Sequence, residues 1–196
     1  MIRRDIREEI LQSGSALMHF KGYNHTGIKQ ITDSVGIPKG SFYNYFKSKE
    51  QFAVAALEYM SQKTLHRMHS YFGDQTKPPV DRITGFFSDM IEINIREFNF
   101  KQGCFIGNFC QEMADVNARI GEKIDYIFRK YTAMLSDCLS QAQQNGDLRK
   151  DYDIDKLAEF IFNSWEGALM RMKASRNASP LTAFMDILTE VIFSPS

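Results

Sequence analysis

Residues 26–50 carry more structural information than any other segment of this 196-residue chain, and they read Thr26-Gly-Ile-Lys-Gln-Ile-Thr-Asp-Ser-Val-Gly-Ile-Pro-Lys-Gly-Ser-Phe-Tyr-Asn-Tyr-Phe-Lys-Ser-Lys-Glu50. Three apolar residues recur at helical spacing in the first half: Ile28, Ile31 and Val35. Gly36 supplies a tight turn, and Pro38 suits the first turn of a following helix, because the N–H that proline lacks would be unpaired there. Phe42 and Phe46 lie four residues apart and give the second helix one buried face. The segment therefore predicts a helix-turn-helix.

The other face of the second predicted helix carries short or planar hydrogen-bonding groups, which suit a DNA major groove. We expect DNA contacts from Lys39, Gly40, Ser41, Tyr43, Asn44, Tyr45 and Lys49. The two lysines and the Tyr43 hydroxyl suit phosphates, and Gly40 lets the backbone approach closely. Ser41, Asn44 and Tyr45 are candidates for base edges, since asparagine pairs bidentately with adenine and an aromatic edge can meet a thymine methyl. The alternative is that these are ordinary solvent-facing residues.

The charge distribution favours contact with DNA at one end of the chain. Basic and acidic residues both number 24, which argues against a protein that coats nucleic acid indiscriminately. Residues 1–50, however, hold eight Lys/Arg against five Asp/Glu, so the acidic surplus lies in the remainder. A modestly basic head on an acidic body fits local phosphate contact.

Residues 36–50, Gly-Ile-Pro-Lys-Gly-Ser-Phe-Tyr-Asn-Tyr-Phe-Lys-Ser-Lys-Glu, resemble the recognition segment of the TetR/AcrR family of bacterial repressors. The resemblance covers roughly the first 50 residues directly, and the remainder is similar in its all-helical layout. It implies the same DNA-contacting surface and adds Thr26 as a phosphate contact at the start of the helix before the turn. Pro38 stands where many members have serine and Tyr45 where histidine is common, so the DNA sequence that is read does not follow from the resemblance.

Apolar periodicity and turn residues predict an all-α protein of nine helices and two domains. Besides the helix-turn-helix pair, the expected helices cover residues 4–20, 48–72, 81–98, 104–113, 117–145, 153–175 and 180–192. The expected caps and helix-ending glycines are Thr26, Ser48 with Gln51, Asn117, Asp153, Gly22 and Gly146. We expect a helix-turn-helix DNA-binding domain at 1–50 and a helical effector-binding and dimerisation domain at 51–196.

The last two predicted helices carry more apolar positions than one chain needs to cover, so we expect a homodimer that forms through them. The surplus positions are Leu169, Leu181, Phe184, Leu188 and Ile192.

Composition argues against several other classes of protein. No stretch approaches the run of about 18 apolar residues that a membrane helix requires, and the amino terminus lacks a signal core, so we expect a cytoplasmic protein. Three cysteines without CxxC spacing indicate neither a disulfide framework nor a structural zinc site. His66 and His69 lie three apart but lack a third ligand of suitable spacing. We therefore predict no metal, no cofactor and no catalytic residue.

The predicted middle helices are rich in phenylalanine and methionine, which suggests a cavity for a small organic inducer. The residues expected to bind an effector are Phe87, Met90, Ile91, Asn94, Cys104, Asn108, Phe109, Trp165 and Lys173, with Glu112 as a further polar group. The alternative is that the apolar members are plain core.

Cys104 has a separate argument, because it falls at the predicted amino end of a short helix, where the helix dipole favours a thiolate. The segments Gly103-Cys-Phe-Ile-Gly-Asn-Phe-Cys-Gln-Glu112 and Trp165-Glu-Gly-Ala-Leu-Met-Arg-Met-Lys-Ala-Ser-Arg176 resemble the sensor domain of an electrophile- and chlorine-sensing TetR subgroup. The resemblance implies a reactive cysteine at Cys104 with Lys173 beside it. An inert buried thiol is the alternative.

Two functions follow as hypotheses. The favoured one is a dimeric repressor whose inducer, bound in the body, alters the separation of the two recognition helices and lowers affinity for a two-fold operator. The alternative is an all-α thiol-dependent enzyme with Cys104 as nucleophile, although no histidine lies near the cysteine motif in any helical register.

Overall fold

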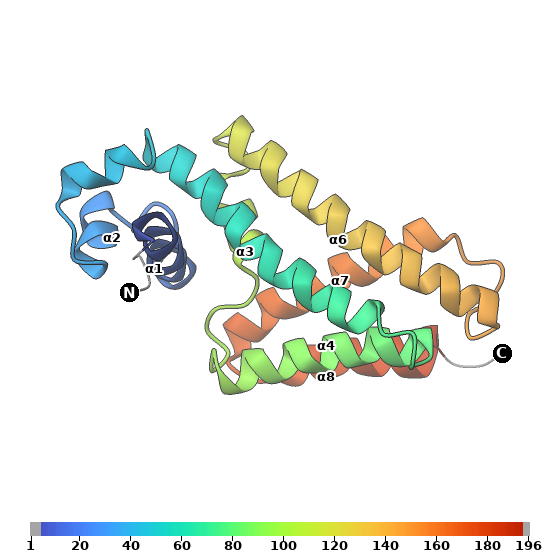
Figure 1. The fold of residues 1–196 in the computed structure, drawn as a ribbon. Coiled ribbons are helices and arrows are strands. Elements are labelled where there is room, and N and C mark those ends of the chain that lie inside the picture. The colour runs from blue at the N-terminus through green and yellow to red at the C-terminus, as the bar shows by residue number, and fades with distance from the viewer. Residues whose placement is uncertain (1–4, 194–196) are drawn as a thin grey trace. The chain divides into compact units, whose positions relative to one another are not determined.

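The computed structural model describes residues 5–193, and within this range the chain is entirely helical, without a strand, as predicted (Figure 1). The elements are α1 (Ile6–Lys21), α2 (Ile28–Ser34), the 3₁₀ helix η1 (Lys39–Asn44), α3 (Lys49–Phe72), α4 (Pro79–Arg96), α5 (Phe105–Met113), α6 (Ala118–Asn145), α7 (Ile154–Ser175), α8 (Ser179–Ile187) and the π-helical turn η2 (Leu188–Ile192). Since η2 continues α8, the described part of the chain matches the nine predicted helices. Arg4, the predicted start of the first helix, lies outside the described residues.

Local side-chain chemistry sets most of the helix ends where the sequence predicts them. Asn117 and Asp153 cap α6 and α7, each accepting a backbone N–H of the first turn, at 3.0 and 3.2 Å. Ser48 caps α3 in the same way at 3.0 Å. Gly22 and Gly146 follow α1 and α6 with φ of 85° and 87°, a region that disfavours residues with a Cβ.

One local prediction is wrong. The cap of α2 is Gly27, whose N–H donates to Gln30 Oε1 at 3.1 Å, and not Thr26. Thr26 is fully buried and donates its hydroxyl to the Gly22 carbonyl at 2.7 Å, so it serves the turn before the helix. The predicted helix after the Gly36 turn is present as a 3₁₀ helix of six residues, a form that proteins use for short pieces.

Packing groups the chain into two compact units. The head unit contains the residues up to 63 together with 105–127, and the body unit contains 64–104 together with the residues from 128 onward. α3 and α6 each supply residues to both units. By packing, α5 and the first part of α3 group with the helix-turn-helix. The domain division predicted at residue 50 remains a prediction.

Three phenylalanine rings form the centre of the helix-turn-helix within the head unit. Phe42 and Phe46 are buried, as predicted, and both pack on Phe52 at the start of α3, with ring centroids 5.7 and 5.1 Å away. The Arg7 guanidinium covers the Phe46 ring at 5.3 Å. This cluster fixes η1 on α3 with its other face outward.

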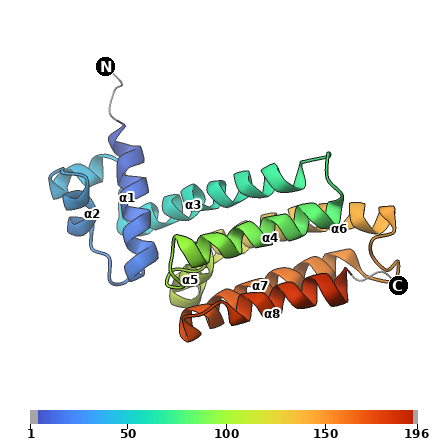
Figure 2. The same ribbon diagram turned by 90° about the horizontal axis from the view of Figure 1, so that it is seen from below.

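In the body unit, α4 and α7 lie beside α8 (Figures 1 and 2). Phe87 on α4 lies at the core of the unit, with ring centroids 5.2 Å from Phe86, 5.3 Å from Trp165 and 5.0 Å from Phe184. All four side chains are buried. In the part of the chain that the structure describes, no helix is long and apolar enough to cross a membrane.

Candidate DNA-binding surface and effector site

The side chains of η1 divide cleanly into a buried and an exposed set. Because Phe42 and Phe46 point into the head core, the remaining residues of the segment face solvent. Lys39, Gly40, Tyr43, Asn44 and Tyr45 are exposed and Ser41 is half-buried. The Gly36 turn, with φ of 70°, sets this surface at an angle to α2. A Cβ built on Gly40 would meet nothing within 4 Å, so the fold itself does not require glycine there.

Two of the predicted phosphate contacts lie elsewhere. The Lys49 ammonium sits 4.2 Å from the centroid of the Tyr23 ring, and burial lowers its pKa while nearby Glu112 opposes that shift. Thr26 is buried with its hydroxyl engaged. In this conformation neither side chain lies on the exposed η1 surface, so we expect neither to contact phosphate.

Glu112 on α5 has a role that the sequence analysis missed. Its carboxylate accepts the backbone N–H groups of Tyr23 and Asn24 at 2.8 and 2.7 Å, in the connection between α1 and α2. A Cβ on Gly22 would lie 2.8 Å from Glu112 Oε2, so glycine is needed at this approach. Glu112 is thus a structural link within the head unit, and its predicted place as a polar group of the effector cavity remains a prediction.

Aromatic contacts join α5 to the last turn of α1 and to the same connection. The His19 ring packs edge-on against Phe105 at 5.5 Å, and Tyr23 against Phe109 at 5.9 Å. Asn108 and Phe109 therefore belong to the head unit, whereas the other predicted effector residues belong to the body unit.

The apolar effector residues of the body unit lie in its core or next to it. Phe87 and Trp165 are buried against each other, and Met90 and Ile91 are half-buried. Asn94 is buried, donates to the Met90 carbonyl at 2.9 Å, and has an Oδ1 that accepts no hydrogen bond from the described residues. Their role in effector binding remains a prediction.

The segment before α5 crosses α7 closely. Gly103 has φ of 64°, and a Cβ built on it would lie 3.0 Å from Lys173 Cδ and 3.9 Å from Leu169 Cβ. Cys104 follows directly and is the last residue before α5, as predicted. Its thiol interacts electrostatically with Lys173. The structure thus brings together the two residues that the subgroup resemblance pairs.

Glu166 completes this cluster, and sequence reasoning missed it. The Cys104 thiol is hydrogen-bonded to the Glu166 carboxyl, and burial raises the pKa of Glu166 to about 7, against the opposing effect of that hydrogen bond. Its Oε1 is buried and accepts no hydrogen bond from any residue in the described range. Glu166 is the sole acidic residue between 160 and 172, in a mostly apolar run. An isolated carboxyl in such a run is the sequence feature that could have identified it.

Lys173 and the other two thiols, Cys138 in the body unit and Cys110 in the head unit, have different surroundings. Burial lowers the pKa of Lys173, as does the positive charge of Arg176, while Cys104 raises it. Burial raises the pKa of the Cys138 thiol to about 11, and that thiol points to the Pro79 carbonyl at 3.6 Å, so Cys138 is a core residue. Cys110 is half-buried on α5.

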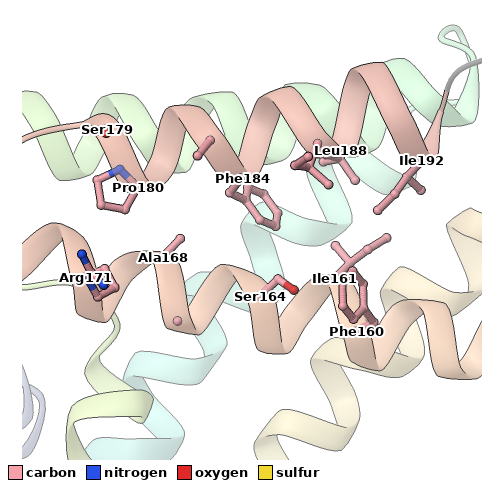
Figure 3. A pocket seen from close by; sticks show the side chains of 13 residues that line it. Phe160, Ile161, Ser164, Ala168, Arg171, Ser179, Pro180, Phe184, Leu188 and Ile192 are labelled. Carbon is pink, nitrogen blue, oxygen red and sulfur yellow. The ribbon is translucent and has the colours of Figure 1, made fainter.

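An apolar groove of about 530 Å³ runs between α7 and α8 (Figure 3). Exposed apolar side chains lie on the same helices: Phe160 at 58%, Ile187 at 51% and Val191 at 59% exposure. The surplus positions named from sequence lie deeper, since Leu169, Leu181, Phe184 and Leu188 are buried within the chain itself. Those four positions are core, and of the five only Ile192 is partly accessible.

Comparison with known proteins gives matches along nearly the whole chain. Residues 10–56 match the family model "Bacterial regulatory proteins, tetR family", and residues 79–188 match "Tetracyclin repressor-like, C-terminal domain". The HTH-type transcriptional repressor DhaR of Mycobacterium sp. (strain GP1) is 32% identical over 98% of this chain and 94% of its own length. The crystal structure of regulatory protein TetR from Rhodobacter sphaeroides has a TM-score of 0.88 at 28% identity, covering 94% of this chain and 97% of that one. The reduced form of Escherichia coli NemR has a TM-score of 0.87 at 26% identity, covering 98% and 100%.

Proposed function

The chain belongs to the TetR family of bacterial transcriptional regulators and is a DNA-binding repressor, and from that premise we propose that a small electrophile releases it from its operator by adding to Cys104. The observation that carries the proposal is the Cys104, Glu166 and Lys173 cluster at the amino end of α5. The alternative of a thiol-dependent enzyme has no support among relatives that are named repressors.

The exposed face of η1 is the proposed operator-reading surface. Lys39 contacts a phosphate, and the close approach at Gly40 brings the backbone to the DNA. Asn44, Tyr45 and Ser41 meet base edges. The buried Phe42 and Phe46 hold these groups in a fixed array, which is what specific readout requires. Because it acts on the chromosome, the protein works in the cytoplasm.

Dimerisation uses the outer faces of α7 and α8. The groove between these helices and the exposed Phe160, Ile187 and Val191 leave an apolar surface that a second copy would cover. A two-fold pairing of this face places one η1 surface on each half of a two-fold operator.

Signal transfer runs along α5. Cys104 is joined covalently to the first residue of α5, and two turns later Glu112 holds the backbone of Tyr23 and Asn24. An adduct on Cys104 adds bulk at the start of this helix and thereby favours a head arrangement with lower operator affinity.

The test starts from duplexes that the purified protein selects from a random library. The parent should bind them as a dimer and release them on treatment with a quinone. Cys104→Ser should bind with similar affinity and stay bound, and Cys110→Ser, the matched thiol control on α5, should release like the parent. If Cys104→Ser releases as the parent does, a reversible ligand is the better account.

A further inference from the structure

The Cys104 thiol interacts with two ionisable groups of α7, Glu166 and Lys173. Glu166 and Lys173 are seven residues apart, two helical turns, so their side chains leave the same face. Gly103 lies against Lys173 and Leu169, and the Cys104 thiol is hydrogen-bonded to Glu166. The thiol therefore interacts with both an ammonium and a carboxyl.

We propose that Glu166 is the proton acceptor for Cys104, taking the thiol proton as the sulfur adds to an α,β-unsaturated carbonyl compound. The inference rests on the proposed sensing role of Cys104 and adds the group that makes the thiol reactive. Lys173 alone stabilises a thiolate but gives its proton no destination within the site.

The surroundings of Glu166 suit this role. Its Oε1 is buried and unpaired among the described residues, so an ionised carboxylate has the thiol as its hydrogen-bond donor and little else to stabilise its charge. Burial brings its pKa to about 7, close to the working pH, where a carboxyl is an effective base. Burial and the Cys104 thiol are the two influences on this pKa, while Lys173 interacts with Cys104 and Arg176.

The step balances without an oxidant. The S–H bond of Cys104 breaks as its proton moves to the Glu166 carboxylate, and the sulfur electron pair forms an S–C bond to the β-carbon. The C=C π electrons move to the carbonyl oxygen, and the resulting enolate takes a proton from solvent. The products are a thioether and a neutral Glu166, and a buried neutral carboxyl is less costly than a buried carboxylate.

A competing interpretation predicts the opposite effect. If the Glu166 carboxylate acts only through its negative charge, it disfavours the thiolate and slows the reaction. Replacing it by glutamine would then make Cys104 more reactive. The direction in which Glu166→Gln changes the alkylation rate of Cys104 therefore distinguishes a proton acceptor from a purely electrostatic neighbour.

The experiment measures the rate at which acrylamide, a small uncharged acceptor, alkylates Cys104 in the full-length protein. The rate is measured from about pH 6 to about pH 9, at intervals of about half a pH unit. Mass spectrometry of the Cys104 peptide separates this thiol from Cys110 and Cys138. The parent rate should rise through about pH 7, following Glu166 ionisation, and then level off. Glu166→Gln should react about tenfold more slowly near pH 7.5, and its rate should keep rising toward the ordinary thiol pKa of about 8.5.

Glu159→Gln, an exposed carboxylate on the same helix, is the matched control and should match the parent. An equal or faster rate for Glu166→Gln across the pH range would overturn the proposal. A second measurement needs no variant: alkylation removes the thiol donor, so the parent at neutral pH should gain the infrared carbonyl band of a protonated carboxylic acid, and its absence also counts against Glu166. Operator release is scored separately with Cys104→Ser, so a failed sensing role and a failed base are distinct results.

Discussion

At the scale of single residues, side chains of the same type have different roles because they have different contacts. Lys39 is exposed on η1, whereas Lys49 stands over the Tyr23 ring with a pKa lowered by burial. From the sequence, both lysines are predicted to contact phosphate, because a pattern of charges does not show which ammonium packs against the protein. We therefore expect different roles for them, operator contact for Lys39 and head packing for Lys49.

Substitution of the two lysines should therefore give different results. Lys39→Ala should flatten the slope of log K against log salt by about one unit with little loss of stability. Lys49→Ala should leave the slope nearly unchanged and lower the melting temperature, since it removes a cation–π contact worth roughly 0.5–1 kcal/mol. Salt titrations on selected DNA and thermal unfolding check both, and equal slopes for the two variants would argue against this assignment.

Glu166 should make stability depend on pH. Its pKa of about 7 in the folded chain lies above the ordinary value of 4.5, so the folded state holds the proton where the unfolded state has lost it. Stability should fall as pH rises from about 4.5 to 7 and then level off, by up to about 3 kcal/mol. In denaturant titrations across this range, Glu166→Gln should show a smaller fall than Glu159→Gln, and parallel curves would contradict the buried carboxyl.

At the scale of elements, α5 is short but holds the α1–α2 connection by one carboxylate and two ring contacts. These partners are about 90 residues apart in sequence, as the separations of 89 and 88 for the Glu112 hydrogen bonds show. No local pattern reports such pairings.

Helix ends, by contrast, depend on side chains within one turn, which is why Ser48, Asn117 and Asp153 were predictable. The same locality explains the error at Thr26, because a threonine before a helix looks like a cap unless its hydroxyl is known to serve the preceding turn. The helix order was likewise readable from apolar spacing, whereas the Glu166 and Glu112 contacts are tertiary and were not.

The link through α5 has a direct test. Glu112→Gln should cost about 1–3 kcal/mol, because a neutral amide replaces a carboxylate that accepts two backbone N–H groups. Operator affinity should fall as well, while dimer mass stays constant. Glu122→Gln, an exposed carboxylate on α6, should change neither quantity. Unfolding curves and operator-binding isotherms are measured for the parent and both variants. Unchanged stability and operator affinity for Glu112→Gln would exclude α5 as the link to the DNA-binding surface.

At the scale of the whole molecule, regulation requires two copies, and the apolar groove between α7 and α8 is where we expect them to meet. The dimer residues predicted from sequence are mostly ones that the chain buries for itself, because apolar spacing does not separate the inner from the outer stripe of a helix. Leu188 is such a case, since it is buried while neighbouring Ile187 is half exposed.

Dimer disruption should follow that distinction. Ile187→Glu combined with Val191→Glu should yield a folded monomer, because both side chains are exposed within one chain and would be buried by a partner. Leu188→Glu should unfold the protein instead. Val116→Glu, at an apolar position 69% exposed in the head unit, should stay dimeric. Sedimentation equilibrium reports the masses, and a dimer of unchanged stability for the double variant would exclude this face.

The most direct measurement follows operator release and Cys104 modification in the same samples. The dimer is held on a fluorescent selected duplex, titrated with a quinone at neutral pH, and read by anisotropy, after which mass spectrometry gives the modified fraction of each cysteine. We expect the fraction of released duplex to rise with the fraction of Cys104 that is modified and to be independent of modification at Cys110 and Cys138. Full occupancy of Cys104 with the duplex still bound, or release while Cys104 remains free, would contradict it.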